Sequence, residues 1–134
     1  MKLSFDEWNR NQNVGSSEIE IESIEIAIDY LQLLDGKKRT MLLITPENND
    51  KYIIFGGGDD KFIVNIVVGD DEGFYNLLNE FFINKNDTSE VVTGGQAGIF
   101  EKKYIVDFNM AKDALVYFIQ NSEPSPYLIW ERDF

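Results

Sequence analysis

The stretch from residue 51 to residue 69 constrains the fold most, because it predicts two β-strands joined by a tight turn. The strand over 61–69, KFIVNIVVG, is apolar on both of its alternating faces. Such a pattern is typical of a central strand that is covered on both sides. The preceding segment, YIIFGGG, is a second apolar strand, and GGDD between the two is a turn sequence. Strands joined by so short a connection pair antiparallel.

Further strands and two helices are expected around this pair. Strands are predicted over 18–22, 38–47 and 127–132. Residues 91–108 are predicted to form two more strands around a glycine-rich bend. Segment 74–83 is compatible with either a strand or a helix. Residues 1–17 are polar with isolated apolar side chains, which favours a loosely structured or edge-lying start.

Both predicted helices carry a regular apolar stripe. Over 23–35 the apolar residues recur at three and four positions, with Ser23 as the N-cap and Gly36 as the C-cap. The second helix opens at Asn109, and its stripe is Ala111, Ala114, Leu115 and Phe118. The pattern predicts a single α+β domain over 1–134, with a mainly antiparallel sheet of about five or six strands and two helices packed against it.

The charge balance is strongly acidic. Twelve Lys and Arg stand against 24 Asp and Glu, which gives a net charge of −12. Residues 59–90 alone hold eight acids against two bases. A surface of this kind repels nucleic acid and anionic membranes and attracts cationic partners. Together with the lack of an apolar secretory signal or a long apolar run, this predicts a soluble, cytoplasmic protein without nucleic-acid or membrane partners.

Residue types that carry most enzyme chemistry are missing from the chain. Without His or Cys, the commonest general base, the usual nucleophile pairs and most zinc sites are excluded. The acidic pairs Asp59–Asp60 and Asp70–Asp71 stand in Gly-flanked turns, where aspartate is a good turn residue. We therefore expect no catalytic residue, no metal site and no cofactor.

The C-terminal third has a recognisable order of motifs. A glycine-containing strand pair (TGGQAGIFEKKYIVDF) precedes an Ala-bearing helix (MAKDALVYFIQN), a proline-marked turn (EPSP) and a last strand that ends in Trp-Glu (YLIWE). In this order the chain resembles immunity protein family one of bacterial polymorphic and contact-dependent growth inhibition toxin systems. The N-terminal half, with IESIEIAIDYLQLL, TMLLIT and a hairpin around glycines, is compatible with that family over about residues 18–132.

The resemblance implies a non-catalytic, cytoplasmic protein that binds and neutralises a cognate toxin domain, typically a nuclease or a deaminase. An acidic inhibitor would approach such a basic toxin quickly and cover its active site. The predicted contact residues are Asp59, Asp60, Asp70, Asp71 and Glu72. Trp130 is expected to face the core and Glu131 the opposite side, so that the pair fixes the last strand. The sequence leaves open whether the protein is a monomer or a homodimer.

Three other functions remain open from the sequence. An acidic nucleic-acid mimic or adaptor would inhibit a DNA-binding protein. A small-ligand module or carboxylate-based enzyme would need two converging carboxylates in a deep pocket. A scaffolding domain would dimerise through an edge strand.

Overall fold

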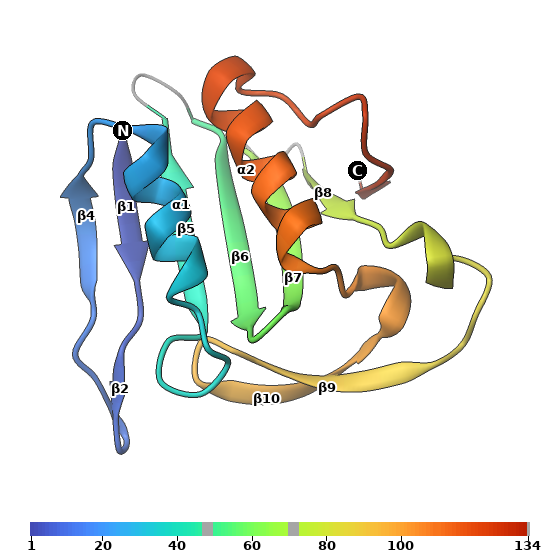
Figure 1. Cartoon of the computed structure of the whole chain (residues 1–134), viewed down its shortest axis with the longest axis horizontal. Helices are drawn as coiled ribbons and strands as arrows, with labels where there is room; N and C mark the ends of the chain where they lie inside the picture. The colour runs from blue at the N-terminus through green and yellow to red at the C-terminus, as the bar shows by residue number, and fades with distance from the viewer. Residues whose placement is uncertain (47–49, 70–72, 134) are drawn as a thin grey trace.

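The computed structural model describes residues 1–46, 50–69 and 73–133, and Figure 1 shows their arrangement. They form a seven-stranded sheet in which each pairing is antiparallel, together with two α-helices and two small two-stranded ribbons. The predicted α+β class is confirmed, and the sheet has slightly more strands than the five or six expected. Neither α-helix in the described ranges has the length and apolar character needed to cross a bilayer.

The elements have the following bounds. In spatial order, the main sheet contains β11 (Trp130–Asp133), β8 (Gly73–Leu77), β7 (Lys61–Val68), β6 (Tyr52–Gly58), β5 (Met41–Thr45), β1 (Lys2–Phe5) and β4 (Ser16–Glu20). The ribbons are β2 (Trp8–Asn9) with β3 (Gln12–Asn13), and β9 (Thr88–Thr93) with β10 (Gln96–Glu101). The helices are α1 (Ile24–Gln32) and α2 (Phe108–Asn121), and two 3-10 turns are η1 (Glu80–Phe82) and η2 (Lys102–Tyr104).

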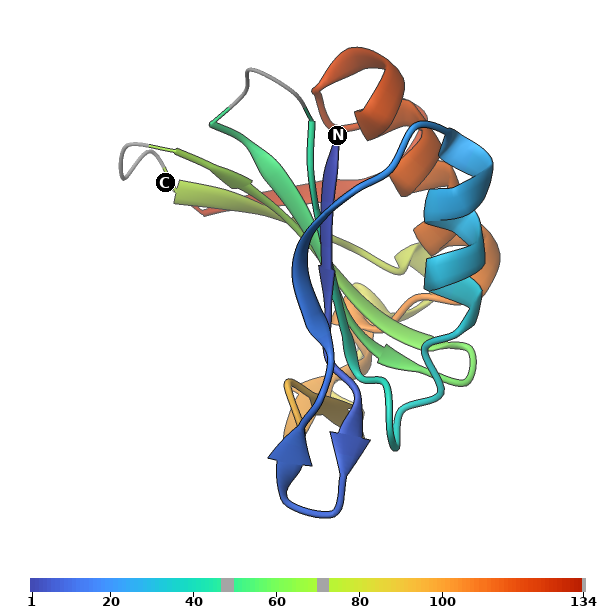
Figure 2. The ribbon, with the colours of Figure 1, turned by 90° about the vertical axis from the view of Figure 1, so that its left-hand side faces the viewer.

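The core lies between the sheet and the two helices, which Figure 2 shows on the same side of the sheet. Strand β7 directs Phe62, Val64 and Ile66 into this core, and its alternate residues are half-buried on the opposite face. The central position predicted for this strand is confirmed. Ribbon β9–β10 crosses one end of the second face, where the side chain of Thr93 lies over Gly56. The sequence pattern predicts that strand β7 is covered on both faces. It is fully covered on the face that packs against the helices and only partly covered on the other.

Both helices begin at side-chain caps. The Ser23 hydroxyl accepts the N–H of Ile26 at 3.2 Å, as predicted. Helix α2 starts at Phe108 instead of Asn109, because the Asp107 carboxylate caps it by accepting the N–H of Met110 at 2.9 Å. The predicted apolar stripe of α2 is fully buried, with Ala111, Ala114, Leu115 and Phe118 each at 0% exposure.

The predicted C-cap at Gly36 is wrong. Helix α1 ends at Gln32 with Leu33 as its C-cap. The next residues form a separate turn, in which the Asp35 carboxylate accepts the N–H groups of Lys37, Lys38 and Arg39 at 2.9 to 3.0 Å. Gly36 has a φ of +73° within that turn.

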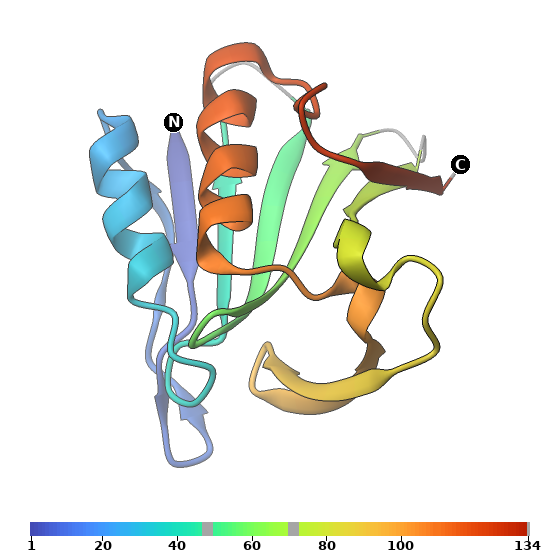
Figure 3. The same ribbon diagram turned by 45° about the vertical axis from the view of Figure 1, so that its right-hand side comes forward.

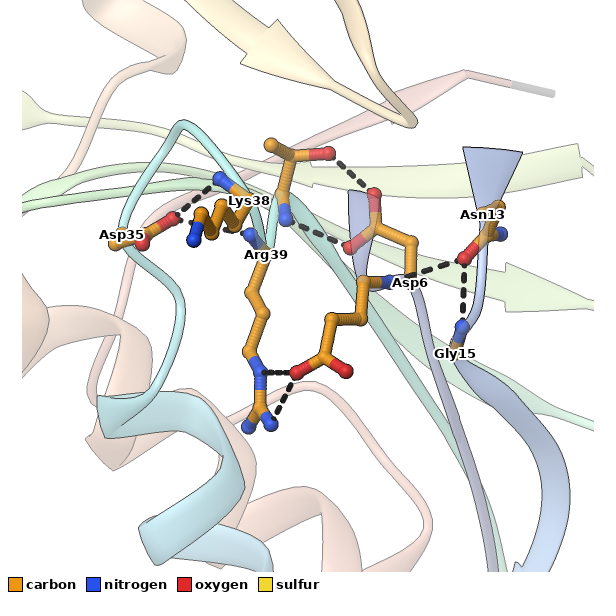
Figure 4. A network of polar contacts seen from close by, with 8 residues as sticks. Asp6, Asn13, Gly15, Asp35, Lys38 and Arg39 are labelled. Atoms are coloured by element: carbon orange, nitrogen blue, oxygen red, sulfur yellow. Dashed lines mark hydrogen bonds and ion pairs between the residues drawn. The ribbon is translucent and has the colours of Figure 1, made fainter. Parts of the chain in front are cut away.

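The expectation of a loosely structured segment over 1–17 is also wrong. Strand β1 lies between β5 and β4, with Leu3 at 0% exposure. The next buried residue, Asp6, which Figure 4 labels, is 1% exposed, and its carboxylate accepts the N–H groups of Thr40 at 2.7 Å and Met41 at 2.9 Å. The indole N–H of Trp8 donates to the same carboxylate at 2.7 Å. These bonds fix the N-terminal segment to a strand that lies about 35 residues later in the chain.

Segment 74–83 contains both of the structures that its sequence allows. It is a strand up to Leu77 and a 3-10 turn from Glu80 to Phe82. The last strand begins at Trp130, later than predicted, and pairs with β8 at the edge of the sheet (Figure 3).

Candidate partner-binding surface

The predicted contact residues Asp59 and Asp60 form the turn between β6 and β7. Gly58 pairs with Lys61, and the two aspartates between them have φ values of +52° and +64°. This is the two-residue hairpin turn with positive φ at both central positions. Asp60 also accepts the N–H of Phe108 at 2.8 Å, and the N–H of Asp59 donates to the carbonyl of Leu34 at 3.2 Å. Both residues therefore hold the turn against the start of α2 and the end of α1.

The same two residues line an open groove of about 630 Å³. Asp35 joins them from the loop after α1, and Lys37 lies in the same groove. Burial acts to raise the pKa of the Asp35 carboxyl, but hydrogen bonds from three backbone N–H groups outweigh it and lower the pKa below its ordinary value. We call the carboxylates of Asp35, Asp59 and Asp60 the turn surface.

The other three predicted contact residues, Asp70, Asp71 and Glu72, lie outside the described residues. The described neighbours that flank them are Gly69 and Gly73, at the end of β7 and the start of β8. Lys61 and Val68, the two ends of β7, are about 23 Å apart. Asp59 and Asp60 thus lie at the opposite end of β7 from Val68.

Trp130 and Glu131 point to opposite faces of β11, in the orientation expected. Trp130 packs against the core, and its indole N–H donates to the carbonyl of Ser125 at 3.0 Å. Glu131 accepts the hydroxyl of Tyr104 at 2.8 Å and the amide of Asn76 at 3.5 Å on the other face. Burial and the Glu131 carboxylate both raise the pKa of the Tyr104 phenol.

A second and larger groove was not identified from the sequence. It has a volume of about 920 Å³ and is lined by residues of the edge strand β4, of the segment between β4 and α1, and of both helices. We call it the strand–helix groove; among its lining residues are Ile19, Glu20, Glu22, Ile26, Tyr30 and Ile119.

One signal for this groove is present in the sequence, namely a segment that contains several acids and no base. Residues 16–33 contain five acids and no Lys or Arg. What this segment does not show is that Ile119, almost a hundred residues away, completes the apolar lining.

Among the described residues, no group of three or more acidic side chains is arranged so that it could hold a metal ion. Buried side-chain nitrogen and oxygen atoms in the same ranges all have hydrogen-bond partners. The chain matches no model of a known protein family, and a search of curated proteins finds no relative.

Proposed function

We propose that this protein is a cytoplasmic, non-catalytic immunity protein that binds and neutralises a cognate bacterial toxin domain, a basic nuclease or deaminase. It does so by covering the toxin's active site with an acidic surface. The toxin's Lys and Arg side chains pair with exposed carboxylates, and a few apolar side chains anchor the contact.

The observation that carries the proposal is the contact between the first and the last of the four motifs in the C-terminal third. The Tyr104 hydroxyl, just after the glycine-containing ribbon, donates to Glu131 of the Trp-Glu strand at 2.8 Å. Trp130 in turn binds Ser125 in the proline-marked turn, and the Ala-bearing helix α2 lies against the sheet with both Ala111 and Ala114 fully buried. The four motifs are thus neighbours in space (Figure 3). The resemblance therefore concerns motifs that pack together in one folded unit, which supports it more than four separate short motifs in the sequence would.

The distribution of charge is the second support. The net charge of −12 favours fast association with a cationic protein. On the turn surface, Asp59 and Asp60 are exposed, and they directly precede the first residue of β7. We propose that these two carboxylates contact the toxin, with Asp70, Asp71 and Glu72 as further contacts outside the described residues.

The proposal is tested with a tagged copy of the protein and a lysate of the source bacterium. Bound proteins are eluted with high salt and identified by mass spectrometry. The expected result is one basic toxin domain in roughly equal amount, whose toxicity in a susceptible cell is suppressed when this protein is co-expressed. Recovery of a DNA-binding protein that the chain inhibits, with no toxin, would instead favour the acidic mimic.

Salt dependence tests the electrostatic part of the proposal. Association with the recovered toxin is measured by stopped flow at about 0.02 M and about 0.5 M NaCl, between which the screening length falls from about 20 Å to about 4 Å. The rate constant is expected to fall at least tenfold. An unchanged rate would remove the role proposed for the acidic surface.

A further inference from the structure

We propose that the strand–helix groove binds a cationic amphipathic helix of the toxin domain; this inference rests on the proposed function and adds a second contact surface to the turn surface. Three features of the groove carry it: an apolar lining that is accessible to solvent, two glutamates but no Lys or Arg among its described lining residues, and an edge strand that is unsuited to pairing.

The apolar lining comes from both helices and from the sheet edge. Ile26, in the first turn of α1, is an apolar residue that is 40% exposed. Tyr30, one helical turn later on the same face, and Ile19 and Ile119 on either side are half-buried. An amphipathic helix buries its apolar stripe in a groove of this kind through anchors spaced at three, four and seven residues.

The rim of the groove determines the sign of the partner's charge. Glu22 is exposed, and the Glu20 side chain is 61% exposed although it lies 3.5 Å from the amino group of Met1. Residues 16–33 contain three further acids, Glu18, Glu25 and Asp29, which are exposed near the groove in sequence but are not among its lining residues. A helix whose polar face carries Lys or Arg is therefore attracted to the groove, and one that carries Asp or Glu is repelled.

The edge strand itself is a poor template for a partner strand. Among the described strands, β4 pairs with β1 alone, but Glu18 has a φ of +56° and the register shifts between Leu3 and Phe5. An irregularity and charged side chains are the features that prevent strand addition at sheet edges. A helix lying in the groove fits these features better than an added strand.

The test uses a synthetic peptide of about 18 residues, which is about 27 Å long as a helix. It places Leu on one helical face and Lys on the other. The peptide is titrated into the ¹⁵N-labelled protein, and amide shifts are followed by NMR. A second peptide with Glu in place of each Lys is the control. We expect saturable binding of the Lys peptide, with the largest shifts at Ile19, Ile26, Tyr30 and Ile119, and no binding of the Glu peptide.

Matched variants separate the groove from general acidity. Ile26→Lys and Glu22→Lys change an apolar and an acidic residue of the groove. Leu33→Lys and Asp113→Lys make the same changes at exposed positions outside it, Leu33 being 50% exposed. We expect each groove variant to bind the Lys peptide about tenfold more weakly and each control within about twofold of the original protein. Circular dichroism checks that all four variants are folded.

Three results would overturn the inference: no binding of the Lys peptide, shifts spread over the turn surface as strongly as over the groove, or equal weakening by groove and control variants. None of these results would bear on whether the lysate experiment recovers a toxin domain. Conversely, groove-specific peptide binding without any toxin in the lysate would support the docking surface and contradict the immunity function.

Discussion

Replacement of Asp6 by Asn should destabilise the protein far more than a neighbouring change of the same kind. The Asp6 side chain is 1% exposed and serves four donors. One oxygen accepts the N–H groups of Thr40 and Met41, and the other accepts the indole N–H of Trp8 and the Thr40 hydroxyl. The carboxylate thereby ties β1 and the β2–β3 ribbon to the start of β5.

The cost follows from what an amide can replace. The Asn oxygen can still accept hydrogen bonds from the two backbone N–H groups. Each of these bonds becomes weaker by about 1 kcal/mol, because the acceptor is no longer charged. The Asn NH₂ group then faces the Trp8 N–H, and an unpaired donor costs about 1–3 kcal/mol. The Thr40 hydroxyl oxygen already accepts the N–H of Gly95 at 2.9 Å, and it can reorient to accept from Asn as well. Because a neutral amide is easier to bury than a carboxylate, part of the loss is offset, and we expect a net cost of about 3 kcal/mol.

Urea unfolding followed by tryptophan fluorescence and circular dichroism measures this cost. With a slope of about 1.5 kcal/mol per M, the midpoint should fall by about 2 M. Glu7→Gln is the matched control, because Glu7 pairs with Arg39 at 2.6 Å while its side chain stays 38% exposed. That variant should lose less than about 1 kcal/mol. Equal losses in the two variants, or a loss below 1 kcal/mol for Asp6→Asn, would refute the reasoning from burial and donor count.

Three further predictions concern other parts of the fold. In a double-mutant cycle, Tyr104→Phe and Glu131→Ala should show a coupling of about 1–2 kcal/mol in urea unfolding, because the first removes the donor and the second the acceptor of the same hydrogen bond; additive losses would contradict it. The folded state lowers the pKa of Asp35 below its ordinary 3.8, so its contribution to stability is complete above that pH and is lost as the pH falls through the lower folded value. Asp35→Asn should therefore weaken the pH dependence of stability below about pH 4, measured by urea midpoints at pH 2 to 6; an unchanged slope would count against it. Gly57→Ala should cost at least about 2 kcal/mol, because φ is +96° and a Cβ would meet the Lys61 carbonyl and Val91, whereas Gly94→Ala, at φ +58° with no atom within 4 Å, should cost about 1 kcal/mol; equal midpoints would contradict the packing argument.

Local patterns predicted those elements whose neighbours in sequence are also their neighbours in space. The β6–β7 hairpin follows from alternation on either side of a two-residue turn, and the stripe of α2 follows from helical spacing. Strand β1 could not be predicted in this way. The segment Lys2–Phe5 is short, and its burial depends on pairing with β5, which lies about 40 residues later. A pairing between segments so far apart in the chain produces no pattern within either segment that would predict it.

For the two candidate surfaces, the turn surface and the strand–helix groove, the sequence predicts the acidic charge but not the shape. The turn around Asp59 and Asp60 is visible in the sequence because glycines flank it. By contrast, the strand–helix groove is assembled from a strand, two helices and the N-terminal residue, so its apolar lining is scattered along the chain. The acids at its rim are visible as a run, but exposed acids on a strand and a helix also occur on surfaces that bind nothing.

The acids in the part of the chain that the structure describes divide into those that accept hydrogen bonds within the fold and those that do not, and the division bears on where a partner binds. Asp6, Asp35, Asp60 and Asp107 each accept backbone N–H groups, and Glu131 accepts the Tyr104 hydroxyl. A partner that recruits such a carboxylate must compete with bonds that hold the fold together. Glu22, which lines the groove, has no such bond among the contacts described, and neither has Asp59 at its carboxylate. Since a carboxylate without an internal donor gives up only water on binding, the acids of this second kind can pair with a toxin's Lys and Arg without cost to the fold.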